Sequence, residues 1–141
     1  MLKRIIVMLL ITGFAFTGCT KSDSPMPLTK ENIIKYLKAM AEAGNGMSAK
    51  EADEAQKNEA VRAEAMKKML VQPLEKMGYN YDKTIGAAAR KIVDRDYPVG
   101  DSEFQMALIG LLQVPGQMKD FLLKYNIITA ETKDLLVKAG Q

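Results

Sequence analysis

A chain of 141 residues with one cysteine and no histidine can form a single domain, but it cannot form an internal disulfide. The same composition excludes Cys/His and Ser/His/Asp catalytic sites, and also zinc or haem sites built from His and Cys ligands. The 20 basic and 17 acidic residues give a formal net charge of +3, which falls to +1 without Lys3 and Arg4. Because the basic and acidic residues are nearly equal in number, no nucleic-acid-binding surface is expected.

The beginning of the chain has the pattern of a secretory signal peptide. Basic Lys3 and Arg4 precede an apolar run over residues 5–16, which small residues follow. This run is shorter than the ~20 apolar residues that a permanent membrane-spanning helix needs. We therefore expect residues 1–18 to be removed.

The signal ends in Phe16-Thr17-Gly18-Cys19, which resembles the lipobox of bacterial lipoproteins, with Phe16 where leucine is usual. The resemblance implies that Cys19 becomes the new N-terminus. It also implies that Cys19 carries several fatty acyl chains such as palmitate, which together anchor the protein stably in a membrane. Thr20, in place of aspartate, resembles lipoproteins that are passed to the outer membrane, where the body faces the periplasm. The alternatives are a conventional signal peptide with an incidental cysteine, or a buried free cysteine.

Residues 19–28 are interpreted as the lipidated cysteine and a flexible tether, because the polar, proline-punctuated segment 20–27 offers nothing to bury. Residues 29–141 are predicted to form a single helical domain, since the apolar spacing is helical and no run alternates as a strand does. We predict an all-α fold, a small irregular or orthogonal bundle of five to six helices.

The first predicted helix is capped by Thr29 and ends at the glycines of residues 44–46. Its expected buried face consists of Ile33, Ile34, Leu37, Met40 and Ala41.

Ser48 and Glu51 form a capping box that opens a long helix over residues 49–71, which Pro73 should break or kink. The first half of this helix offers only alanines to a core, so we expect it to be half exposed. Gly78 should end a short segment over residues 74–77.

A further helix is predicted over residues 82–94. The segment 103–114 is apolar on nearly every side, which is typical of a central helix surrounded by others. Pro115 should begin the next helix, and Thr129 should cap the last one.

Acidic residues gather around the loop over residues 95–102, but their spacing does not match a calcium loop, because Pro98 stands where a ligand belongs. We interpret them as solvated helix ends, with Asp101 or Ser102 as an N-cap. The acids concerned are Asp94, Asp96, Asp101 and Glu103. No cofactor, metal site or catalytic residue is predicted, and the protein is not expected to be an enzyme.

Methionine is unusually frequent, with eight of the ten residues beyond Cys19. The Met66-x-x-Met69 spacing resembles copper-binding methionine motifs, but it is also the spacing of two core residues on one helix face. Methionine-rich helical surfaces also suit grooves that hold acyl chains or partner helices.

The long helix and the turn that follows it form the candidate partner-binding surface. The alternative is a solvated helix that salt pairs stabilise, or, for the tyrosines, a cover for the end of the bundle. The candidate residues are Glu51, Glu54, Glu64, Met66, Lys67, Met69, Leu70, Tyr79 and Tyr81.

The leading hypothesis is a membrane-anchored module that binds another envelope protein as an accessory, assembly or inhibitory subunit. Its plan, a lipidated tether and a compact helical body, is similar to that of secretion pilotins. An exposed apolar patch, expected on residues 49–77, would indicate this function. An enclosed methionine-lined cavity would instead indicate a carrier or sensor of a hydrophobic small molecule or lipid, and converging acids would indicate an enzyme.

Overall fold

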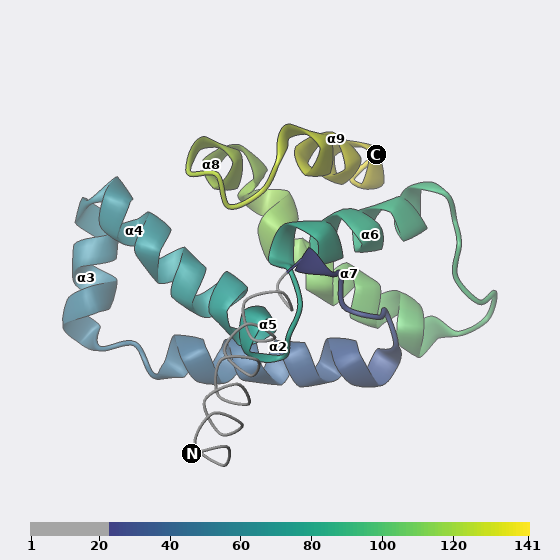
Figure 1. Cartoon of the computed structure of the whole chain (residues 1–141), viewed down its shortest axis with the longest axis horizontal. Helices are drawn as coiled ribbons and strands as arrows, with labels where there is room; N and C mark the ends of the chain where they lie inside the picture. Colours follow the sequence, from purple (N-terminus) through teal and green to yellow (C-terminus); the bar gives the residue numbers. More distant parts are fainter. Residues whose placement is uncertain (1–22) are drawn as a thin grey trace, which may run out of the picture.

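The computed structural model describes residues 23–141, which are helical and contain no strand. Because α4, η2 and α5 follow one another without a break, this part of the chain has seven helices, against the five to six predicted. The predicted all-α bundle is confirmed (Figure 1). In chain order the elements are α2 (Lys30–Asn45), α3 (Ala49–Lys57), α4 (Glu59–Met66), the π-helical η2 (Lys67–Val71), α5 (Gln72–Lys76), α6 (Tyr81–Val93), α7 (Ser102–Gln117), α8 (Lys119–Lys124) and α9 (Ala130–Ala139).

The segment that leads into α2 is bound to the body, which corrects the prediction that residues 20–27 have nothing to bury. The side chain of Met26 is 1% exposed and belongs to the core. The Met26 N–H donates a hydrogen bond to Thr84 Oγ1 at 2.9 Å, and the Asn80 N–H donates one to the Ser24 carbonyl at 2.7 Å. Within the described residues, any free tether therefore ends before Ser24.

The first helix, α2, begins and ends where the sequence predicts. Thr29 Oγ1 accepts a hydrogen bond from the Asn32 N–H at 3.2 Å, and Gly46 forms the C-cap. The buried face is rotated from the predicted one, because Tyr36 is buried whereas Ile34 is 43% exposed.

The predicted long helix over residues 49–71 is wrong, because Asn58 divides it into α3 and α4. Asn58 has extended backbone angles (φ −127°, ψ 118°), and its Oδ1 accepts hydrogen bonds from the Ala60 N–H at 2.9 Å and the Val61 N–H at 3.4 Å. An asparagine side chain that satisfies these donors competes with the helical backbone and starts a new helix. α3 and the first turns of α4 consequently form an arm that projects from one end of the body (Figure 1).

Replacing Asn58 with alanine is expected to lower the free energy of unfolding by about 1 kcal/mol, because two N–H groups lose their acceptor. Urea denaturation monitored by circular dichroism measures the change. Gln56→Ala, an exposed position on α3, should stay within about 0.5 kcal/mol of the parent. An equal effect of both variants would contradict the capping role.

The ladder of helical hydrogen bonds is disturbed at Pro73, as predicted, but the helix does not end there. Pro73 has no N–H, and in an α-helix its ring would clash with the carbonyl of Met69 four residues earlier. The chain widens into the π turn of η2 just before the proline, where the Gln72 N–H bonds to the Lys67 carbonyl. Gly78, with φ of 97°, ends this helix as predicted.

The body of the bundle is centred on α6, α7 and α9. α6 and α9 approach closely at Gly86, where a Cβ would lie only 3.1 Å from Thr132 Oγ1. Asp101 caps α7 by accepting from the Phe104 N–H at 3.1 Å, and Thr129 caps α9. α7 continues through the buried Pro115 to Gln117, so the prediction of a new helix at this proline is wrong.

α7 is not surrounded on all sides, which corrects its predicted central position. Phe104, Leu108 and Leu111 face the core, but Met106 is 71% exposed and Ile109 is 55% exposed. α2 covers another side of α7, with Lys30 Nζ and Glu103 Oε2 2.6 Å apart at one end. One face of α7 therefore presents apolar side chains to solvent.

Candidate functional site

The exposed face of α7 borders an apolar groove. The groove has a volume of about 350 Å³ and is open to solvent. It lies between the middle of α7, the end of α6 and the end of α9. Its walls are formed by Ile92, Ile109, Leu112, Gln113, Gly116, Leu136, Ala139 and Gly140.

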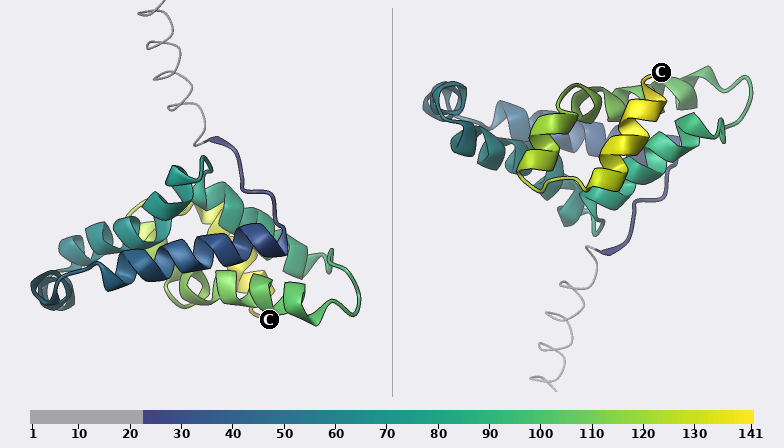
Figure 2. Two further views of the ribbon diagram at one scale, coloured as in Figure 1. Left: turned by 90° about the horizontal axis from the view of Figure 1, so that it is seen from below. Right: turned by 90° about the horizontal axis from the view of Figure 1, so that it is seen from above.

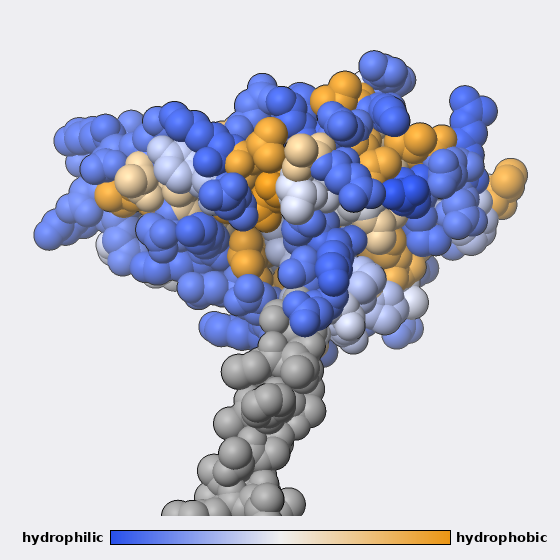
Figure 3. Space-filling model, turned by 45° about the horizontal axis from the view of Figure 1, so that its top comes forward, coloured by the Kyte–Doolittle hydropathy of each residue, from blue (hydrophilic) through white to orange (hydrophobic). Residues whose placement is uncertain are grey.

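Met106 extends this groove along α7. Met106 and Ile109 are three residues apart, so they lie on the same side of the helix. Both side chains are more than half exposed, and Ile109 is also part of the groove wall. We call the groove and Met106 together the α7 groove. On the face that Figure 3 shows, apolar side chains lie in several patches between polar ones.

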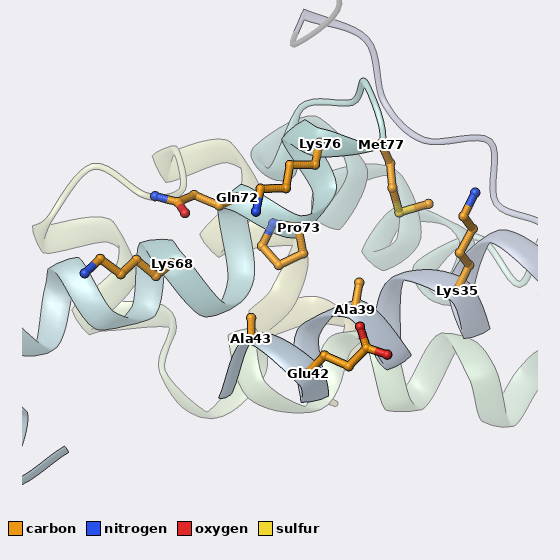
Figure 4. A pocket seen from close by; sticks show the side chains of 9 residues that line it. All are labelled: Lys35, Ala39, Glu42, Ala43, Lys68, Gln72, Pro73, Lys76 and Met77. Carbon is orange, nitrogen blue, oxygen red and sulfur yellow. The ribbon is translucent and has the colours of Figure 1, made fainter. Parts of the chain in front are cut away.

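A second groove, of about 720 Å³, separates α2 from η2 and α5 (Figure 4). Three lysines and one glutamate supply its charged groups, and Pro73 forms part of its floor. Lys76 extends over this floor, and Lys35 rises from α2 at one end (Figure 4). We call it the lysine groove; its lining residues are Lys35, Ala39, Glu42, Ala43, Lys68, Gln72, Pro73, Lys76 and Met77.

The predicted partner-binding residues do not form one exposed surface. Leu70 is 1% exposed and Tyr81 is 2% exposed, so these two predicted anchors belong to the core. Met66, Met69 and Tyr79 are partly buried against that core. The remaining residues are polar and lie at or near the surface: Glu51, Glu54, Glu64 and Lys67, of which Lys67 and Glu64 form an ion pair at 3.3 Å.

The location of the apolar surface on α7 was missed from the sequence. Helical periodicity marked residues 103–114 as apolar on nearly every side, but it could not show which side would lack a neighbouring helix. The prediction of an apolar patch on residues 49–77 is therefore corrected: the most exposed large apolar side chains of the described helices are Met106 and Ile109.

The acids of the 95–102 loop serve helix ends and surface ion pairs. Besides the cap formed by Asp101, Glu103 binds Lys30, and Asp96 Oδ2 lies 3.6 Å from Lys91 Nζ. Hydrogen bonding to Glu103 raises the pKa of Lys30. Across residues 23–141, no three acidic, histidine or cysteine side chains are grouped so that they could hold a metal ion.

The methionines are mainly packing residues. Met26 is fully buried, and Met106 is the exposed exception. The other members that pack against the core are Met40, Met66, Met69, Met77 and Met118. Their thioethers fill space between helices, as expected for a flexible apolar side chain.

Two buried tyrosines have strongly perturbed ionisation. Burial raises the pKa of Tyr36 far above its usual value, and the Tyr36 hydroxyl donates a hydrogen bond to the Leu70 carbonyl at 2.8 Å. Burial also raises the pKa of Tyr81, with smaller contributions from Tyr36 and Asp82. Among the described residues the Tyr81 hydroxyl has no hydrogen-bond partner.

None of the helices in residues 23–141 is both long enough and apolar enough to cross a membrane. The predicted signal peptide, the lipobox and Cys19 lie outside the described residues. Comparisons with protein-family models, with curated proteins and with solved structures found no match to this chain.

Proposed function

We propose that this protein is a lipid-anchored component of the cell envelope whose helical body binds another envelope protein through the α7 groove. The observation that carries the proposal is the exposure of Met106 and Ile109, 71% and 55%, beside an apolar groove. Clustered apolar side chains at the rim of a groove are typical of protein-binding surfaces, because a partner that covers them removes their surface from water.

The position of the α7 groove supports this function. Gly140 lines the groove close to the C-terminus, and the C-terminus lies on the side of the body opposite to the point where the N-terminal segment enters (Figure 2). With Cys19 as the anchor, the α7 groove faces away from the membrane. Both soluble and membrane-bound partners can reach the α7 groove in this orientation. Such access is required of an accessory, assembly or inhibitory subunit.

The alternative, a carrier or sensor of a hydrophobic molecule, has weaker support. The apolar groove is open, and its walls are mainly isoleucine, leucine, alanine and glycine. Most methionines of the described helices pack against the core instead. A carrier is expected to enclose most of its ligand surface, and a groove of this shape leaves one side of a ligand in water.

A photo-crosslinking amino acid in place of Ile109 tests the proposed function in intact envelopes. We expect one dominant adduct, because the position lies at the centre of the proposed interface. The same amino acid in place of Gln56, an exposed residue of the arm, should give little adduct. The adduct should also disappear with Cys19→Ala, which removes the proposed anchor.

Ile109→Glu is expected to reduce the adduct formed from position 106 at least about tenfold, because binding would bury a carboxylate in an apolar interface. The fold should be retained, since the side chain of Ile109 is more than half exposed. Gln56→Glu adds the same charge on the arm and should leave the adduct unchanged. Adducts that form from the arm and not from the groove would contradict the proposed site and favour the surface over residues 51–68.

A further inference from the structure

We infer that the lysine groove faces the membrane and binds the anionic headgroups of the lipids in which Cys19 is anchored. This inference rests on the lipid anchor of the proposed function. The lysine groove is separate from the α7 groove, so the proposed binding of a protein partner does not depend on lipid binding by the lysine groove.

The first argument is the length of chain between the anchor and the body. Four peptide units join Cys19 to Asp23, and they span at most ~14 Å when fully extended. From Asp23 onward the chain is held on α6, because the Asp23 carbonyl accepts a hydrogen bond from Lys83 Nζ, the Ser24 carbonyl accepts one from the Asn80 N–H, and the Met26 N–H donates one to Thr84 Oγ1. The point where the chain enters the body must therefore lie within about 14 Å of the lipid headgroups.

The second argument is the size of the body. A domain of this length has a radius of gyration of about 13–14 Å and thus a diameter of roughly 35 Å. A connection shorter than half of that diameter does not let the body turn its opposite side toward the membrane. The side where the chain enters, formed by α5 and the beginning of α6, is held next to the bilayer (Figure 2).

The third argument is the charge on this side. Lys76 lies on α5, and Lys83 in the first turn of α6 donates a hydrogen bond to the Asp23 carbonyl. Lys76 lines the lysine groove together with Lys35 and Lys68, whereas Lys83 lies outside it. Among the ion pairs of the described residues, none involves these four lysines.

The acidic groups nearby do not cancel this charge. Glu42 lines the lysine groove and Glu75 lies on α5. The carboxylate of Asp82, beside Lys83, is directed to α9, where its Oδ1 accepts a hydrogen bond from the Thr129 N–H at 2.7 Å. Four lysines thus face three acids, Glu42, Glu75 and Asp23, that have no ion-pair partner among the described residues, and within the lysine groove itself three lysines face Glu42 alone.

Distance and chemistry both favour lipid phosphate as the ligand. Lysine is a common phosphate-binding residue, because its ammonium is a compact charge on a flexible stem. Basic groups near a bilayer are attracted to anionic lipids within about one Debye length, ~8 Å in physiological salt. The volume of the groove, about 720 Å³, leaves room for a headgroup between Lys35 and Lys76.

The test uses the lipidated protein reconstituted into two kinds of vesicle, one of phosphatidylcholine alone and one with about a third phosphatidylglycerol. A short pulse of an amine-acetylating reagent, followed by mass spectrometry, measures the accessibility of each lysine. We expect Lys35, Lys68 and Lys76 to be acetylated several-fold more slowly on the anionic vesicles. Lys138, on α9 near the opposite end of the chain, is the internal control and should react equally on both.

Matched variants strengthen the test. With Lys35→Gln and Lys76→Gln together, the protection of Lys68 should be lost, whereas Lys50→Gln with Lys138→Gln should retain it. Equal acetylation of the groove lysines on both kinds of vesicle, in protein that floats with the vesicles, would overturn this inference alone. Protein that does not float with either kind would overturn the lipid anchor, and with it both proposals.

Discussion

Met26→Ala is expected to lower the free energy of unfolding by about 2–4 kcal/mol, although the residue lies in a segment that its composition marks as a linker. The Met26 side chain is 1% exposed and belongs to the core, so its removal leaves a cavity between helices. Urea denaturation at neutral pH, monitored by circular dichroism, measures the loss. The effect should appear as a lower midpoint with an unchanged slope.

Met106→Ala is the matched control, because it makes the same chemical change on a side chain that is 71% exposed. Its effect should stay within about 0.5 kcal/mol. If Met26→Ala were equally harmless, the segment that contains Met26 would not be held on the body. The connection between Cys19 and the first fixed residue would then be longer, and the orientation argued for the lysine groove would lose its first argument.

The helix starts were predictable from sequence because capping is local chemistry. Thr29, Ser48, Asp101 and Thr129 each accept a hydrogen bond from an N–H three residues later, as a side chain of this length can do without any distant contact. These local signals, together with the helical spacing of apolar residues, made the all-α bundle predictable, although not its exact number of helices.

Helix breaks were harder to predict because residue type alone does not decide where a helix ends. Asn58 interrupts a run of good helix formers, whereas Pro73 and Pro115 lie inside helices. Proline ends a helix only if neighbouring turns do not adapt, and here the helix widens into the π turn of η2 just before Pro73. Such adaptation depends on what packs around the turn, and residues close in sequence do not determine it.

The candidate site was even harder to predict from the sequence, because residues far away in the chain determine which side chains are exposed to solvent. Leu70 and Tyr81 were expected on a partner-binding surface, but α2 covers this region, and the Tyr36 hydroxyl bonds to the Leu70 carbonyl 34 residues away in the chain. Conversely, none of the helices in residues 23–141 covers Met106 on α7. Periodicity identifies which residues are apolar, whereas the packing of whole helices determines which of them meet water.

Raising the pH from 9 to 11 is expected to lower the free energy of unfolding by about 3 kcal/mol, through Tyr36 and Tyr81. Burial raises the pKa of both phenols above the value of about 10 that they have in the unfolded chain. Below pH 10 both states keep their protons, so the stability is fully present there. Above pH 10 only the unfolded chain ionises, which costs the folded state about 1.4 kcal/mol for each tyrosine at pH 11.

Tyr36→Phe and Tyr81→Phe separate this effect from ordinary loss of packing. At pH 7 Tyr36→Phe should cost about 1–2 kcal/mol, because the buried Leu70 carbonyl loses its donor. Tyr81→Phe should be neutral or stabilising by up to about 1 kcal/mol, because its buried hydroxyl has no partner among the described residues. Each variant should nevertheless remove about half of the alkaline loss, whereas Ile85→Val, a core change without a titrating group, should keep all of it. A variant that carries both substitutions has no buried phenol left in this core. If it still lost as much stability between pH 9 and pH 11 as the parent protein, groups other than Tyr36 and Tyr81 would cause the loss.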